Sequence, residues 1–191
     1  TTLAREKLRV RLAQPPAGAN NAGQRGAPPA ALPMLTYDAP LTFYMNGEEV
    51  HAIPVPVAHT DGDTMVWFPK SDVLMTGDFF RSLGYPNIDI ANGGSLKGML
   101  EGLQAIVNLV GPNTKVVPGH GEVVGRAAVA AHRDMMIAVR DRVARLVQQG
   151  MTLEQVVAAK PTSEYDARVP SAATTSERFI GQLYSELRAN K

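Results

Sequence analysis

The sequence predicts an α/β (α+β) fold built around one main domain of 191 residues. Up to Asp78, short apolar runs separated by turn signals follow one another, which indicates strands. From about residue 95, segments with apolar residues at helical spacing alternate with one short apolar run. With 45% hydrophobic residues, a chain of this length can bury a sizeable core. We therefore expect a sheet with helices packed on it.

The individual elements follow from turn signals and from hydrophobic spacing. Asn46-Gly47 is the strongest short-range hairpin signal. The predicted strands are residues 41–45, 48–57, 64–69, 72–76 and 114–117. The predicted helices are residues 95–110, 127–149, 153–159 and 176–187. One stripe of the longest helix is assigned to the core rather than to a cofactor site: Met136, Val139, Val143 and Leu146.

The N-terminal part differs in composition from the rest. Residues 1–13 predict a short amphipathic helix, because leucines recur near helical spacing among Arg and Lys. Residues 14–33 are rich in Pro, Gly, Ala and Asn and predict a flexible loop. Residues 34–191 then form the main part of the fold.

Composition excludes several classes of partner. The net charge is +1 from 19 basic and 18 acidic residues, so no strong field recruits nucleic acid or an anionic membrane. We expect a small-molecule substrate instead. No apolar stretch approaches the roughly 18 residues of a membrane span. The chain contains no cysteine, so histidines and carboxylates must supply any metal ligands. The cellular compartment is left open, because any targeting segment would precede residue 1.

Three residues of types that can bind metals follow the ends of apolar runs: His59, Asp78 and His120. In open α/β folds the carboxyl ends of strands collect ligands, so two imidazoles and a carboxylate at one rim would form a metal site. His59 and Asp78 also have a simpler explanation. His59 can be a loop histidine bonded to the backbone, and Asp78 can cap the next segment. His120 lies between two glycines, so the backbone there can approach another group closely.

Neighbouring residues are assigned supporting roles. Asp61 and Asp63 lie in a tight turn beside His59, where a carboxylate either orients the imidazole or caps the backbone, and we favour capping for Asp63. Tyr85 and Asp89 are candidates to line the cleft, although a turn around Pro86 explains them equally well.

Other candidates are excluded from the site. His51 lies inside a predicted strand and His132 on the long helix, so both are interpreted as packed or solvent-facing. Gly93-Gly94 is interpreted as a hinge into the next helix, since no fuller phosphate-binding pattern surrounds it.

The ordered motifs carry a resemblance to a known family. AHTDGD at 58–63, VLMTGDFF at 73–80 and KVVPGHG at 115–121 resemble the third, fourth and fifth metal-ligand motifs of the metallo-β-lactamase fold superfamily. The match runs from about residue 41, and residues 152–166 are also similar to bacterial hydrolases of this fold. The resemblance implies an αβ/βα sandwich, of which this chain forms the C-terminal part.

The resemblance also implies a zinc-dependent hydrolase with two zinc ions. His59 would complete the first zinc site, Asp78 would bridge both ions and His120 would bind the second. A zinc-bound hydroxide would attack a lactam, a lactone or an ester-like substrate. The residues that carry out catalysis are not identified, because the superfamily's upstream His-x-His-x-Asp-His motif does not occur in this sequence.

The departure from the superfamily pattern sets the expected activity. Three ligands spread over two sites leave each zinc with at most two, whereas catalytic zinc usually keeps three protein ligands. We expect impaired hydrolysis by this chain alone. The alternative is a non-catalytic fragment or binding module that keeps the fold without a complete zinc site. A sheet without its partner layer also favours a homo-oligomer or a complementary N-terminal segment.

Overall fold

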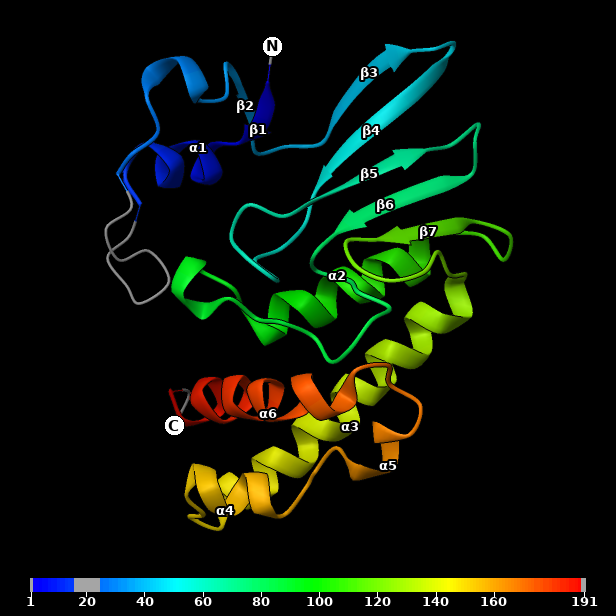
Figure 1. The fold of residues 1–191 in the computed structure, drawn as a ribbon. Helices are drawn as coiled ribbons and strands as arrows, with labels where there is room; N and C mark the ends of the chain where they lie inside the picture. Colours follow the sequence, from blue (N-terminus) through cyan, green and yellow to red (C-terminus); the bar gives the residue numbers. More distant parts are fainter. Residues whose placement is uncertain (1, 16–24, 190–191) are drawn as a thin grey trace.

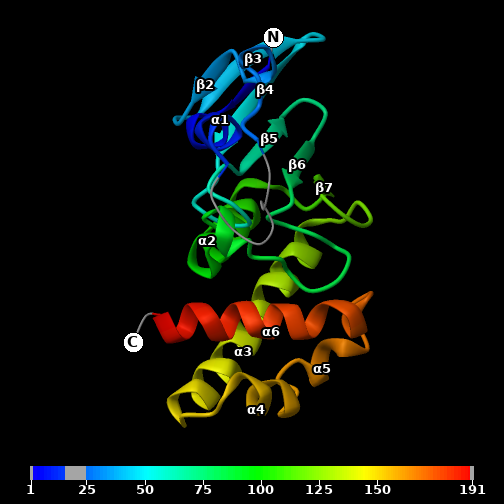
Figure 2. The same cartoon turned by 60° about the vertical axis from the view of Figure 1, so that its left-hand side comes forward.

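A computed structural model describes residues 2–15 and 25–189 of the chain. A five-stranded sheet lies between a small N-terminal unit and a group of helices that cover one face of the sheet (Figure 1). The view in Figure 2 shows the same succession, with the N-terminal unit at one end and the C-terminal helices at the other. The expected α/β class is therefore confirmed.

The five-stranded sheet contains every strand predicted from residue 41 onward. Its strands, in spatial and chain order, are β3 (Leu41–Met45), β4 (Glu48–Pro54), β5 (Thr64–Phe68), β6 (Val73–Gly77) and β7 (Lys115–Pro118). The first four pair antiparallel, whereas β7 pairs parallel with β6. A parallel neighbour requires a crossover, which the chain makes through a helix. Strand β7 is thereby aligned so that it ends at the same edge as β6.

Turn chemistry sets the registers of the two hairpins. Asn46 and Gly47 have φ angles of 52° and 75°, and Met45 pairs with Glu48, as the Asn-Gly signal predicts. In the second hairpin Phe68 pairs with Val73. Four residues therefore connect these strands instead of the predicted two, because β5 ends one residue earlier and β6 begins one residue later than expected.

The outer edge of β7 is covered by a returning segment. Val116 and Val124 exchange two backbone hydrogen bonds, of 2.8 and 3.0 Å, in an isolated antiparallel bridge. The backbone groups of β7 are thus satisfied on both sides at this point.

The N-terminal unit differs from its prediction. The helix expected over residues 1–13 begins only at Glu6 and forms α1 (Glu6–Ala13). The preceding residues form β1 (Leu3–Arg5), which pairs parallel with β2 (Leu35–Tyr37). Pairing with a distant strand satisfies backbone groups that the first helical turn would leave without partners, and so it overrides the local helical spacing.

The predicted loop at 14–33 is described only in part, since residues 16–24 lie outside the described residues. Its last part contains a 3-10 turn, η2 (Pro29–Ala31). The amide of Ala27 donates to the carbonyl of Leu12 at 2.8 Å, which attaches this segment to α1.

The remaining elements are helical. They are η3 (Ile90–Asn92), α2 (Leu96–Leu109), α3 (Arg126–Gln148), α4 (Leu153–Ala158), α5 (Ser163–Asp166) and α6 (Ala172–Ala189). The four predicted helices correspond to α2, α3, α4 and α6, and the short α5 was not predicted. Ser95 caps α2, and Thr152 forms a capping box with Gln155 at the start of α4. No helix in residues 2–15 or 25–189 combines the length and the apolar character needed to cross a membrane.

The core lies between the helices and one face of the sheet. Met136, Val139 and Val143 of α3 are fully buried, and Leu146 packs against them, as the stripe on the long helix predicted. Leu74 and Val116 supply the facing surface from β6 and β7. This packing fixes the positions of the strands whose ends carry the candidate site.

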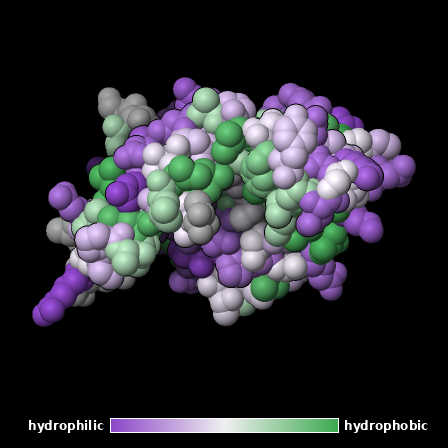
Figure 3. Space-filling model, turned by 90° about the horizontal axis from the view of Figure 1, so that it is seen from above, coloured by the Kyte–Doolittle hydropathy of each residue, from purple (hydrophilic) through white to green (hydrophobic). Residues whose placement is uncertain are grey.

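The other face of the sheet carries a row of apolar side chains. Leu41, Ala52, Val66, Met75 and Val117 are paired across the five strands and so share this face. Leu41 and Met75 expose 37% and 46% of their surface. Figure 3, which views the molecule from above, shows hydrophobic side chains grouped around a hollow. We call these five residues the apolar row.

Gly98→Ala is predicted to destabilise the fold, because α2 packs directly on the backbone before His59. A Cβ at position 98 would overlap the carbonyl oxygen of Val57 and lie 2.6 Å from the carbonyl carbon. We expect the free energy of unfolding, measured by urea denaturation, to fall by about 2 kcal/mol or more.

Gly181→Ala in α6 is the matched control. A Cβ there meets nothing within 4 Å, so the free energy of unfolding should rise by about 0.5–1 kcal/mol through higher helix propensity. Equal effects of the two substitutions would contradict this account of the packing of α2.

Candidate metal centre

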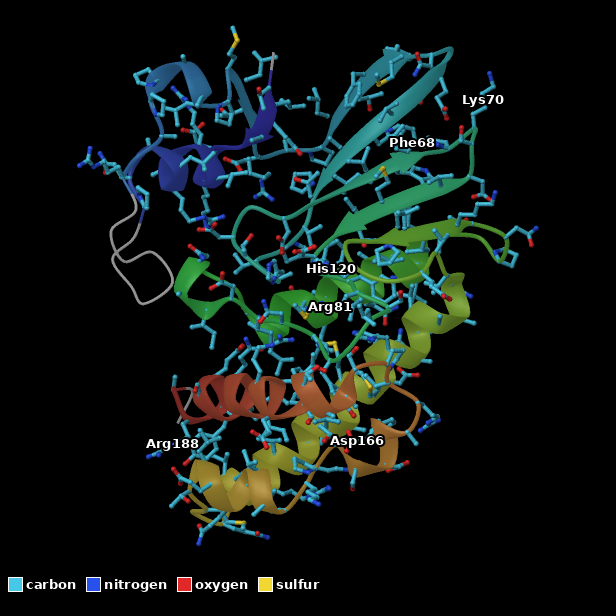
Figure 4. All side chains as sticks on the ribbon, viewed as in Figure 1. Phe68, Lys70, Arg81, His120, Asp166 and Arg188 are labelled. Carbon is cyan, nitrogen blue, oxygen red and sulfur yellow. The ribbon has the colours of Figure 1, made fainter. Side chains whose placement is uncertain are left out.

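The three candidate ligands come together at one edge of the sheet. His59 follows β4, Asp78 follows β6 directly, and His120 follows β7 by two residues. Nε2 of His59 lies 3.8 Å from Oδ2 of Asp78, and Nε2 of His120 lies 3.5 Å from Oδ1 of the same carboxylate. Figure 4 places His120 at this edge, above the helices, beside Arg81. The parallel pairing of β6 with β7 is what brings Asp78 and His120 to the same end.

The distances suit two donor pairs that share one carboxylate. Two ligand atoms held at about 2.1 Å on a tetrahedral zinc ion are separated by about 3.4 Å. Each oxygen of Asp78 faces a different imidazole at about this separation. In residues 2–15 and 25–189, however, no three His, Cys, Asp or Glu side chains are grouped so that they could hold one ion. The geometry thus offers two incomplete positions rather than one complete site.

A backbone carbonyl fixes the orientation of the His59 ring on the side away from Asp78. Its Nδ1 lies 2.8 Å from the carbonyl oxygen of Asn87. Because a carbonyl can only accept a hydrogen bond, the proton of the neutral ring resides on Nδ1. Nε2 then presents its lone pair towards Asp78, which is the tautomer that a metal ligand needs.

Backbone contacts hold the segment that carries His59. The amide of Asp89 donates to the carbonyl of His59 at 2.9 Å, and the amide of Ser95 donates to the carbonyl of Ala58 at 2.8 Å. Gly94 packs so closely that a Cβ would overlap the His59 carbonyl oxygen. Gly94, which was interpreted as a hinge, is therefore required for close packing against the candidate site.

The glycines on either side of His120 also serve close packing. A Cβ at Gly119 would overlap Oδ1 of Asp78 and lie 2.7 Å from the carbonyl carbon of Gly77. Gly121 has a φ of 103°, and a Cβ there would lie 2.8 Å from the amide nitrogen of Leu83. The segments after β6 and β7 are thus in direct contact, as the glycines flanking His120 suggested.

The site is open to solvent on one side. The side chain of His59 is 16% exposed, whereas those of Asp78 and His120 are 46% and 53% exposed. The imidazole of His59 is therefore shielded from solvent, whereas the carboxylate of Asp78 and the imidazole of His120 can contact a ligand from solution.

Comparison with solved structures decides the fold. No family model and no curated protein matches the sequence. The inverting sec-alkylsulfatase Pisa1 from Pseudomonas sp. superposes with a TM-score of 0.61 and 18% identity, covering 84% of this chain. BLEG-1, a B3 metallo-β-lactamase, superposes with a TM-score of 0.57 and 18% identity, covering 70% of this chain. TTHA1623 in a di-iron-bound form superposes with a TM-score of 0.51 and 19% identity, covering 67% of this chain. The chain has the metallo-β-lactamase fold.

This chain spans only part of each of those proteins. It covers 27% of Pisa1, 64% of BLEG-1 and 61% of TTHA1623. The superpositions confirm, at the level of the fold, the resemblance to the metallo-β-lactamase superfamily seen in the sequence.

Within this metallo-β-lactamase fold, neither carboxylate near His59 orients its ring. Asp61 pairs with the guanidinium of Arg11 in α1, so its expected contact with the imidazole is not formed. Asp63 accepts hydrogen bonds from the amide and hydroxyl of Thr60, at 3.0 and 2.9 Å, and so caps the turn. Burial raises the pKa of Asp63, and the bonds from Thr60 partly offset that shift.

The two residues that were expected to line the cleft, Tyr85 and Asp89, instead make contacts that support the fold. Tyr85 is fully buried, stacks on Phe179 and donates a 2.6 Å hydrogen bond to Asp166, so it does not line an open cleft. Burial and this carboxylate raise its pKa. Asp89 accepts hydrogen bonds from the amide and side chain of Asn92 and caps η3. Tyr85 thus serves packing against α6, and Asp89 serves as the cap of η3.

The excluded histidines lie outside the site. His51 contacts Thr42 and Glu49 on the sheet. His132 packs edge-on against Phe80, with the two ring centroids 5.3 Å apart. Burial, with a smaller contribution from the positive charge of Arg81, lowers the pKa of His132 to about 4.

Sequence reasoning missed Arg81, which follows Asp78 by three residues. Its Nε donates to the carbonyl of Leu83 at 2.8 Å, and no carboxylate lies within ion-pair distance of it in the described part of the chain. The only signal in the sequence that could have indicated Arg81 is its position three residues after a carboxylate at the end of a predicted strand.

Acidification is predicted to destabilise the protein through His132. In the folded state its pKa is about 4, whereas the ordinary value is 6.5. Between these pH values the unfolded chain binds more protons, so the free energy of unfolding should fall as pH is lowered from 6.5 to 4. Urea denaturation across this range checks the prediction. His132→Gln should lose this part of the pH dependence, and an unchanged slope would rule out the assignment to His132.

Gly119→Ala is predicted to displace the Asp78 carboxylate, because the new Cβ overlaps Oδ1. Chemical shifts of the His120 and His59 rings, measured by NMR, should change together. In the matched control Gly125→Ala, a Cβ meets nothing within 4 Å, and both rings should keep their shifts. Unaltered ring signals in Gly119→Ala would refute the proposed contact.

Proposed function

We propose that this chain carries the ligand-bearing edge of a zinc-dependent hydrolase acting on a small molecule. His59 and Asp78 would hold one zinc ion, and Asp78 and His120 a second. The observation that supports this most directly is that each oxygen of Asp78 faces a different imidazole, at 3.8 and 3.5 Å. A carboxylate so placed suits a bridge between two cations.

Zinc bound there would polarise a substrate oxygen and make a water molecule more acidic, as lactam, lactone and ester hydrolysis requires. The chain's own groups prepare this chemistry. Asn87 keeps the His59 ring turned towards the carboxylate through the 2.8 Å bond to Nδ1. Gly119 lets the His120 loop approach Asp78 closely, so that both donors stay at one edge.

The structural neighbours support the same class of function. Pisa1 is a sec-alkylsulfatase, BLEG-1 is a metallo-β-lactamase, and TTHA1623 has a di-iron-bound form. The pair of metal ions in TTHA1623 agrees with the two donor pairs proposed here. The identities are below 25%, so the substrate of this chain is proposed only as a small molecule with a bond that water can cleave.

A second candidate function follows from the number of ligands. Three protein donors over two positions are fewer than catalytic zinc usually has, so an isolated chain can be a binding module without hydrolytic activity. A complementary segment that carries His-x-His-x-Asp-His would supply the remaining donors. The two candidates differ in whether hydrolysis appears when such a segment is added.

Removing the shared carboxylate should weaken zinc binding more than removing one imidazole. We predict that Asp78→Ala reduces zinc affinity, measured by calorimetric titration, by about tenfold or more, and His120→Ala by less. Stability should change little, since both side chains are about half exposed. His51→Ala, on the same sheet but outside the site, is the control and should leave zinc affinity unchanged. If both Asp78→Ala and His120→Ala bound zinc with wild-type affinity, the proposed zinc site would be refuted.

The apolar row is expected to mediate association with a second copy or a complementary segment. Light scattering should show the isolated chain as an oligomer, and Met75→Lys should shift it towards monomer, because a charge on this face opposes burial. Tyr44→Lys is the control, since residue 44 points to the opposite face of β3 and is 76% exposed. A monomer that also fails to gain hydrolysis with the complementary segment would contradict both partner proposals.

A further inference from the structure

A pocket separate from the three ligands lies between α3, the segment after β6 and the loop after α5. Its volume is about 380 Å³, which is within the range of small-molecule sites. Phe80 and Ser82 form one wall, and Ala131 and Met135 of α3 form another. The pocket adjoins the candidate centre, because the amide of Ser82 donates to the carbonyl of His120 at 3.0 Å.

The chemistry of the lining is apolar with one positive charge. Apolar side chains of the lining include Phe80, Val124, Met135 and Val169, and the exposed Arg168 also lines the pocket. No aspartate or glutamate lines the pocket among the described residues. A ligand with an apolar body and a negative end would therefore find complementary groups and no repelling carboxylate.

Arg168 is held in place but not neutralised. Its guanidinium lies over the ring of Tyr165, 5.2 Å from the ring centroid. Arg142 lies 5.4 Å from the same centroid but pairs with Glu164. In the described part of the chain no carboxylate is within ion-pair distance of Arg168, and the nearby Asp166 accepts the hydroxyl proton of Tyr85. The donors of Arg168 are thus available to a bidentate anion.

Two further cations strengthen the field around the pocket. Burial lowers the pKa of Arg178, and the positive charge of Arg81 lowers it further. Arg178 donates to the carbonyls of Tyr85 and Pro86 rather than to a carboxylate. Near the floor, His132 is packed against Phe80 and can offer a neutral ring nitrogen to a polar group.

We propose that this pocket binds a small amphipathic anion, an organic acid whose apolar body packs on Phe80 and Met135 and whose carboxylate or sulfate engages Arg168. Zinc is not required for this binding, so the proposal does not depend on the hydrolase function. The site is built from the segment after β6 and from α3 and the loop after α5, elements that the candidate centre uses only in part.

Calorimetric titration of the whole chain with 4-phenylbutyrate tests the proposal, with 4-phenylbutanol and 4-phenylbutylamine as neutral and cationic counterparts. The acid should bind about tenfold more tightly than the alcohol, and the amine more weakly than the alcohol. Arg168→Gln should weaken binding of the acid about tenfold and leave binding of the alcohol unchanged. Ala131→Trp should abolish binding of both, since residue 131 is exposed and its larger side chain fills the pocket without disturbing the core.

Two controls separate this pocket from other modes of binding. Arg145→Gln removes an exposed cation of α3 that lies outside the pocket, and it should leave affinity for the acid unchanged. His120→Ala should also retain binding of the acid, which distinguishes the pocket from a carboxylate bound at a metal ion. Equal affinity for acid and alcohol, no binding of the acid, or loss of binding in His120→Ala but not in Arg168→Gln would each overturn the proposal.

Discussion

The parallel pairing of β6 with β7 is the constraint on which the candidate site depends. Strands that run in the same direction end at the same edge of a sheet, so residues that follow them meet even when they are far apart in the chain. Asp78 and His120 meet in this way, and the glycines around His120 permit the close approach. The buried faces of α2 and α3 maintain that pairing, because they pack on Leu74 and Val116 of the same two strands.

Local signals made much of this arrangement predictable. The Asn46-Gly47 turn, the capped helices and the three candidate ligands that follow strands are encoded in short stretches of sequence, because their physical causes are local. The remaining features depend on distant partners. Strand β1 exists because β2 pairs with it, and Asp61 turns away from His59 because Arg11 binds it. Tyr85 is buried by α6 and bonded to Asp166, contacts that no local hydrophobic period encodes.

Charge is distributed unevenly although the net charge is small. Asp78 provides negative charge between two imidazoles. Arg81 in the adjacent segment, and Arg168 and Arg178 further along the chain, have no carboxylate partner in the described residues. The two regions share residues 78–84 as a common wall.

The backbone bridge between Val116 and Val124 has a consequence for how the sheet can grow. Because this bridge covers the middle of β7, another strand is hindered from adding at that edge, whereas β3 has β4 as its only neighbour in the described chain. Within the five-stranded sheet, contact through the β3 edge would join two molecules by a two-fold axis and then stop, since the β7 edge is hindered. The five-stranded sheet thus opposes open filaments and permits closed pairs.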